Sequence, residues 1–202
     1  MVAVSLAQYA LRLSLPNGEE ILLRQLNRGD AKALRRLYQQ ERSWLEPWEV
    51  TTPGVELAPL GSFPLYRAIK QFNRAARAGR GVVFAICLEE QIIGLVSAAE
   101  IMRGGLQSCQ LGYWIAEQYA GRGIVPHSVA AVIDWLLLDV GLHRVEIGMV
   151  PENLRSRRVV EKLGLRFEGR RLNYIHINGR WQDHDFYAVT VEEASDGIRC
   201  RL

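Results

Sequence analysis

The sequence has little cysteine and histidine and almost no lysine, and each shortage excludes a class of protein. Its three cysteines, Cys87, Cys109 and Cys200, lie far apart and are odd in number, so they do not form a disulfide framework. With only four histidines, no spacing in the chain matches a zinc site, and we expect no metal. Arginine supplies nearly all the positive charge, and the net charge of +3 is too small to indicate nucleic-acid binding by itself.

Long hydrophobic runs are also missing. No apolar stretch reaches the roughly 18 residues that a membrane-spanning helix requires. The first residues, 1–16, lack a basic leading segment and contain Arg12, so a signal peptide is not expected. We therefore expect a cytoplasmic protein with no membrane contact, and the small positive excess suits an anionic ligand such as a nucleotide cofactor.

The chain has the length and composition of one soluble α/β domain. Its 202 residues allow one substantial core and leave no room for a second full domain, so we expect a single domain over residues 1–202. The 49% apolar and 23% charged composition is ordinary for a globular protein.

Hydrophobic periodicity and turn signals predict the order of the elements. Asn178-Gly179 is the strongest hairpin signal, and the prolines and glycines of residues 44–62 predict an irregular segment. Only the strand–helix–strand unit over 107–150 implies a parallel pair, so the sheet should be mixed. We expect helices N-capped by Asp30, from Pro64 to about Gly79, from Gly123 to Gly141 and over 153–163, and strands over 11–15, 20–26, 82–88, 92–101, 107–116, 144–150, 166–177 and 180–191.

The turn that follows the strand at 107–116 carries the clearest chemical signal. Gly121 and Gly123 let the backbone approach an anion without a Cβ in the way. The next helix offers unpaired N–H groups and the positive end of its dipole. The pattern indicates a cradle for a pyrophosphate, with a glycine-rich turn that binds nothing as the equal alternative. The spacing fits neither a Rossmann fingerprint nor a P-loop.

These residues resemble a known family. Gln118-x-x-Gly121-x-Gly123 is similar to the Gln/Arg-x-x-Gly-x-Gly/Ala motif of the GNAT superfamily of acetyl-CoA-dependent N-acyltransferases. The string from Asn153 to Leu165 resembles the family's Asn-x-x-Ser…Glu-Lys-x-Gly-Phe helix, with Leu165 in place of the usual Phe. Trp44-Leu45-Glu46-Pro47-Trp48 and the hairpin at 178–184 resemble the bacterial ribosomal-protein N-terminal acetyltransferases of the RimJ/RimL type.

The resemblance covers about residues 20–192 and implies a fold. That fold is a single GNAT-like α/β domain with a mixed, mostly antiparallel central sheet. Its fourth and fifth strands run parallel and splay apart, and helices flank the sheet.

The resemblance also implies acetyl-CoA as the co-substrate. Asn153 would hydrogen-bond the pantetheine or carbonyl region, although Asn at this place is also a common helix cap. Ser156 would protonate or orient the leaving thiolate, and without the resemblance it would be read as a solvated residue. The backbone of Tyr113, Trp114 and Ile115 would hold the pantetheine arm, and Gln118, Gly121, Arg122, Gly123 and Ile124 the pyrophosphate.

A cluster of arginines follows on the chain. It could meet the 3′-phosphate of CoA, with Arg158 as the assigned contact, or the surface of an RNA-rich particle, or it could be only a solvated face. Its members are Arg155, Arg157, Arg158, Arg166, Arg170 and Arg171.

The acceptor side is less defined. Glu100, an acidic residue at the end of an apolar strand run, is the candidate base, with a solvent-facing carboxylate as the equal alternative and Glu117 ranked lower. A thioester is already activated and an α-amine has a pKa of about 8, so water as proton acceptor can suffice. His184 would contact the acceptor or be structural, because Asp183 points to the opposite face of its strand. The aromatic residues Trp44, Trp48, Tyr174 and Trp181 would form the acceptor channel or cover the core.

The expected function is acetyl transfer from acetyl-CoA to a primary amine, foremost the N-terminal α-amine of a ribosomal or other protein. The alternatives are acetylation of a small amine such as an antibiotic or polyamine, and a non-catalytic module that binds acyl-CoA or RNA. The expected partners are acetyl-CoA, a protein N-terminus or small amine, and the ribosome, for a monomer or homodimer.

Overall fold

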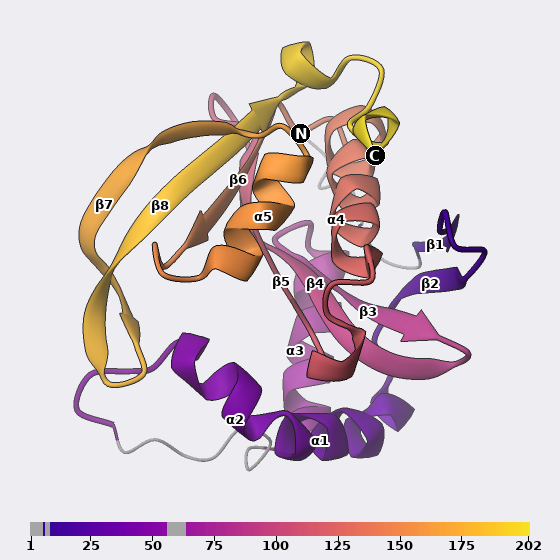
Figure 1. Ribbon diagram of the computed structural model, residues 1–202, viewed down its shortest axis with the longest axis vertical. Coiled ribbons are helices and arrows are strands. Elements are labelled where there is room, and N and C mark those ends of the chain that lie inside the picture. The colour runs from indigo at the N-terminus through magenta and orange to yellow at the C-terminus, as the bar shows by residue number, and fades with distance from the viewer. Residues whose placement is uncertain (1–5, 7–8, 56–63) are drawn as a thin grey trace.

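One sheet of eight strands organises the chain (Figure 1). The computed structural model describes residues 6, 9–55 and 64–202. The strands are β1 (Ala10–Ser14), β2 (Glu20–Gln25), β3 (Val82–Leu88), β4 (Gln91–Met102), β5 (Ser108–Ile115), β6 (Arg144–Met149), β7 (Arg166–Ile177) and β8 (Arg180–Thr190). They lie in the order β1-β2-β3-β4-β5-β6-β8-β7, and β5–β6 is the parallel pair among antiparallel neighbours. The predicted mixed, mostly antiparallel sheet is confirmed.

The parallel pair separates soon after it forms. Ser108–Gln110 of β5 pairs with Arg144–Glu146 of β6, and no further pair joins these two described strands. On its other edge β5 stays bonded to β4 as far as Ile115. The edge of β5 beyond Gln110 therefore faces a wedge-shaped opening and not a neighbouring strand.

Helices cover both faces of the sheet. They are α1 (Ala31–Gln40), α2 (Arg42–Leu45), α3 (Leu65–Arg77), α4 (Ile124–Asp134) and α5 (Leu154–Lys162). The alternation of β3 separates two cores, because Phe84 and Ile86 pack with residues of α4 while Ala85 and Cys87 pack with residues of α1 and α3. None of the helices in the described part of the chain is long and apolar enough to cross a membrane.

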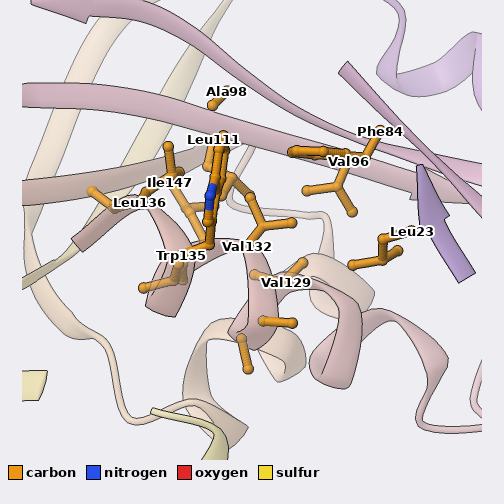
Figure 2. Packing of buried hydrophobic residues seen from close by; sticks show 14 of the residues in the cluster. Leu23, Phe84, Val96, Ala98, Leu111, Val129, Val132, Trp135, Leu136 and Ile147 are labelled. Atoms are coloured by element: carbon orange, nitrogen blue, oxygen red, sulfur yellow. The ribbon is translucent and has the colours of Figure 1, made fainter. Parts of the chain in front are cut away.

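The core beside α4 is the larger one (Figure 2). Val129, Val132 and Leu136 follow the spacing of one helix face and point toward the sheet, as their period predicts. The ring of Trp135 meets the edge of Phe84 at 5.4 Å between centroids. This packing fixes the start of α4 relative to the end of β5, which is where the glycine turn lies.

Three local predictions hold only in part. Asp30 is the N-cap residue of α1, but its side chain does not cap the helix, because it accepts hydrogen bonds from Arg24 (2.8 and 2.9 Å) and from the backbone N–H of Asn27 (2.7 Å). The helix expected to end at Gly141 does so, since α4 continues as a π-helical turn over 135–139 and Gly141 follows with a φ of 72°; the π-helical form of its last turn was not expected.

The third concerns the segment expected to be irregular. Residues 42–48 are helical, as α2 and a 3₁₀ turn over 46–48. An i, i+4 ion pair between Arg42 and Glu46 (3.1 Å) and the anchoring of Trp44 to β5 stabilise this turn against its proline. Residues 49–55 contain no helix or strand beyond an isolated bridge at Val50, as expected, and 56–62 lie outside the described residues.

The core also extends beyond residues 20–192. Leu13 and Leu15 are buried near one end of the chain and Ile198 near the other. The buried carboxylate of Asp134 accepts a hydrogen bond from the backbone N–H of Ile198 (2.6 Å) and one from Arg199 (2.8 Å). The C-terminal turn is thereby fastened to the end of α4.

Candidate active site

Two adjoining cavities lie where β5 and β6 separate. The larger, about 520 Å³, lies between the glycine turn, the start of α4 and one side of α5. The smaller, about 300 Å³, lies among β5, β6, β7 and β8. Trp48, Tyr113, Asn153 and Ser156 line both cavities, so the two spaces meet at these residues.

A hydrogen-bonded pair of hydroxyl groups stands at this meeting point. Tyr113 Oη lies 2.9 Å from Ser156 Oγ and donates to the Ser156 carbonyl oxygen at 3.1 Å. Since Tyr113 donates its own hydrogen to the carbonyl, Ser156 Oγ–H can donate to Tyr113 Oη or turn toward a molecule in the cavities. Burial raises the pKa of Tyr113, so its hydroxyl stays protonated at neutral pH. The pair can supply a proton to a reacting group, and it is not a base.

Asn153 explains why Ser156 stands there. Its Oδ1 accepts a hydrogen bond from the Ser156 backbone N–H (3.1 Å), which is the N-cap of α5. Ser156 is consequently fixed in the first turn of the helix. Asn153 thus caps α5 and also lines both cavities.

The glycine turn has the conformation that its sequence implies. Gly121 and Gly123 have φ angles of +80° and +81°, in the region that favours glycine. A Cβ built at Gly121 would have no other atom within 4 Å, so space remains in front of the turn. Gly123 precedes the first turn of α4, whose leading N–H groups have no intrahelical partner. These features fit the pyrophosphate of acetyl-CoA.

Helix α5 adds positive charge to the same cavity. Arg155, Arg158 and Lys162 line it, and their spacing places them on one side of the helix. Sequence reasoning singled out Arg158 and missed Lys162, although the i, i+3, i+7 spacing of the three cations was a signal. A polyanionic ligand is complementary to this face.

The structure brings most of the predicted cofactor residues together. Gln118 and Arg122 are not among the residues that line the larger cavity: Gln118 is exposed, and Arg122 pairs with Glu19. The predicted residues that line it are Tyr113, Trp114, Ile115, Gly121, Gly123, Ile124, Asn153 and Arg158.

The aromatic residues expected in the acceptor channel divide into two groups. Trp44 lines the larger cavity, where its Nε1 donates to the Ile115 carbonyl oxygen (2.9 Å) and the Arg155 guanidinium lies 4.3 Å from its ring. Trp48 lines both cavities. Tyr174 and Trp181 line neither, and Trp181 is 55% exposed on the closing hairpin.

Glu100 is not brought to the cavities. It is exposed, has a φ of 52°, and lies where the β4–β5 pairing is irregular between Ala99 and Met102. Val96 is the β4 residue opposite Tyr113, whereas Ala99 is opposite Gln110, where β5 and β6 are still joined. The register therefore places Glu100 at the closed end of the wedge.

The other acidic candidate and His184 do reach the cavities. Glu117 lines the larger cavity, and its backbone N–H donates to a carboxylate oxygen of Glu41 (2.8 Å). His184 lines the smaller cavity and is buried. Burial lowers the pKa of His184 below its ordinary value, so the ring is neutral at neutral pH.

Much of the arginine cluster is used within the fold. Arg157 and Arg170 both bind the buried carboxylate of Asp185 (3.1 and 2.7 Å). Arg166 pairs with Glu168 (2.7 Å), and the Arg171 guanidinium lies over the ring of Phe186. The positive charges among the described residues that line the larger cavity are those of α5.

Known proteins share this arrangement. The model of the acetyltransferase (GNAT) domain matches residues 20–166. The chain belongs to the GNAT family and is an acetyl-CoA-dependent N-acetyltransferase.

Three similar proteins illustrate the relationship. The [ribosomal protein uS5]-alanine N-acetyltransferase of Escherichia coli is 28% identical over 89% of this chain and 92% of its own length. The probable N-acetyltransferase YjcK of Bacillus subtilis is 30% identical over 85% of this chain and 94% of its own. Mycobacterium smegmatis RimJ, solved in complex with CoA-disulfide, superposes with a TM-score of 0.86 at 31% identity, covering 96% of this chain and 92% of that one. The predicted resemblance to the RimJ/RimL type is confirmed.

Proposed function

We propose that this enzyme acetylates the N-terminal α-amine of a protein, foremost a ribosomal protein, by direct attack of the amine on the thioester of acetyl-CoA. The observation that carries the proposal is the meeting of two cavities at Tyr113 and Ser156. Acetyl-CoA would occupy the larger cavity and the N-terminus the smaller one, so that amine and thioester meet at the hydroxyl pair.

The lining of the smaller cavity favours an N-terminus over a polycation. Its described wall combines apolar side chains, among them Leu111, Ile147 and Ile175, with uncharged polar groups, and no acidic residue is among the side chains that line it. A polyamine or aminoglycoside carries further positive charges whose burial is costly without carboxylate partners. A small N-terminal residue such as alanine, the target named for the E. coli relative, brings one amine and an apolar side chain.

The chemistry needs few groups. The amine nitrogen bonds to the thioester carbon, and backbone N–H groups on the open edge of β5 can stabilise the developing oxyanion. The C–S bond then breaks, and the Ser156 hydroxyl, backed by Tyr113, supplies the proton for the leaving thiolate. The position of Glu100 does not support a role as base, so we do not assign the amine proton to it.

The test is an acceptor panel with thiol release as the readout. The panel contains a peptide with a free N-terminal alanine, the same peptide N-terminally blocked but containing lysine, spermidine and an aminoglycoside. We expect the free-alanine peptide to have the highest kcat/KM, because its amine has a pKa of about 8 against about 10.4 for lysine. Preference for the blocked lysine peptide or for spermidine would overturn the assignment of the acceptor.

A further inference from the structure

The smaller cavity has a buried histidine in its wall. His184 and Tyr113 are the titratable side chains among the described residues that line it. Tyr113 keeps its proton because it is buried. His184, on β8, is only 4% exposed, so the imidazole is shielded from bulk water and belongs to the cavity wall.

A backbone contact determines the tautomer of this ring. His184 Nδ1 lies 3.2 Å from the carbonyl oxygen of Gln182. A carbonyl oxygen accepts and cannot donate, so Nδ1 carries the hydrogen and Nε2 carries a lone pair. Within the described part of the chain no residue hydrogen-bonds Nε2. The free nitrogen of a neutral imidazole is therefore available to a molecule in the cavity.

The charged residues next to His184 on its strand are bound to other groups and leave Nε2 of the ring free. On β8, Asp183 accepts from the Asn173 backbone N–H (2.9 Å), and Asp185 is bound by Arg170 and Arg157.

From β7, Arg171 stands opposite His184 in the strand register, with its guanidinium over the ring of Tyr174, which meets the His184 ring edge-on at 6.0 Å. Burial outweighs the attraction of Asp183 and Asp185 for a proton on the ring, and the pKa of His184 falls below 6.5.

We propose that His184 is a catalytic residue that accepts the proton of the attacking amine at Nε2. The inference rests on the proposed function in one respect, the entry of a primary amine into the smaller cavity. When the N–C bond forms, the amine nitrogen becomes positively charged and passes one proton to Nε2. When the C–S bond breaks, the thiolate receives one proton from Ser156 Oγ, which regains one from water. The imidazolium then releases its proton to solvent.

The decisive measurement is the pH profile of kcat/KM for the acceptor in wild type and in His184→Gln. In wild type both the amine and His184 must be neutral, so the logarithm of kcat/KM should fall with slope 1 below the pKa of the amine and with slope 2 below the lower pKa of His184. In His184→Gln the second bend should vanish, and kcat/KM at pH 7 should fall about 10²-fold, the low end for a lost general base. The Kd of acetyl-CoA should stay unchanged.

His176→Gln is the matched control. His176 is also a histidine of the closing hairpin, but its Nδ1 bonds the Thr51 hydroxyl (2.6 Å) and it lines neither cavity. This variant should keep both bends in the profile. Exogenous imidazole should partly restore the activity of His184→Ala, because it can replace a missing base but not a missing structural contact. An unchanged slope 2 in His184→Gln, or the same loss in His176→Gln, would overturn the proposal.

The outcomes separate this inference from the proposed function. The profile is measured with whichever amine the wild type acetylates best, so a preference for spermidine would remove the proposed acceptor and leave the test of His184 intact. If His184→Gln does not fold, ¹⁵N imidazole NMR of the wild type decides. It should show hydrogen on Nδ1 and a bare Nε2 that shifts when the acceptor is added; hydrogen on Nε2 would refute the proposed role.

Discussion

The glycine turn allows charge and shape to be tested separately at one position. Gly121→Asp would put a carboxylate in front of the turn, and Gly121→Asn would put an uncharged group of nearly the same size there. Both side chains tolerate a φ of +80° better than other residues, and nothing lies within 4 Å of the new Cβ. The two variants should therefore fold equally well and differ only in charge.

The expected penalty follows from Coulomb's law. A carboxylate about 5 Å from one phosphate charge costs about 0.8 kcal/mol in bulk water and about 3 kcal/mol at an effective dielectric constant of about 20. The cavity is partly enclosed and lined by the cations of α5, so the repulsion should lie between these two energies. With two phosphate charges, the affinity of Gly121→Asp for acetyl-CoA should be at least about tenfold weaker than that of Gly121→Asn.

Isothermal titration calorimetry of both variants with acetyl-CoA measures this difference. The gap should shrink as salt rises from about 0.05 to 0.5 M, because the Debye length falls below the separation of the charges. Equal dissociation constants for Asp and Asn would refute the placement of the pyrophosphate at this turn. A loss in both variants that does not depend on salt would indicate a steric effect instead.

Three further predictions concern other parts of the molecule. Ser156→Ala should lower kcat with little change in the Kd of acetyl-CoA, because the hydroxyl acts as the C–S bond breaks; an unchanged kcat in single-turnover kinetics would contradict this. Trp48→Ala should raise the KM of an alanine peptide more than the Kd of acetyl-CoA, whereas Trp181→Ala, on the exposed hairpin, should change neither in the same assays. Hydrogen bonds from Arg144 and then Arg166 lower the pKa of Glu168 from 4.5 to about 2, so its contribution to stability is present above pH 4.5 and is lost as the pH falls toward 2. The difference between the urea midpoints of wild type and Glu168→Gln should accordingly be full at pH 6 and shrink as the pH falls from 4.5 toward 2, and a constant difference would count against this pairing.

Residues close together in the sequence could be placed from the sequence alone. The turn with Gly121 and Gly123 and the cap and hydroxyl of Asn153 and Ser156 are local patterns whose geometry is set within a few residues. They line the larger cavity as the resemblance implied. The strand–helix–strand unit likewise fixed the parallel pair, because a crossover helix permits little else.

Features that depend on strand register or on distant contacts could not be placed in this way. Glu100 ends an apolar strand run in the sequence, but the irregular pairing with β5 puts it at the closed end of the wedge. The indole of Trp44 bonds Ile115, a residue far along the chain, and no local pattern in the sequence indicates this contact. The neighbouring helical turn was missed because its proline outweighs the local signals, whereas tertiary contacts stabilise it.

The meeting of two cavities at a single hydroxyl pair has a consequence for the order of events in turnover. If each reactant has its own cavity, as we propose, neither must leave before the other enters, and the acetyl group never needs to rest on the protein. Initial rates measured against both reactants should give intersecting double-reciprocal lines, since parallel lines would require a covalent acetyl-enzyme. For the same reason, CoA and the unacetylated peptide can be bound together. Excess peptide should then slow the release of CoA and inhibit the enzyme at high concentration.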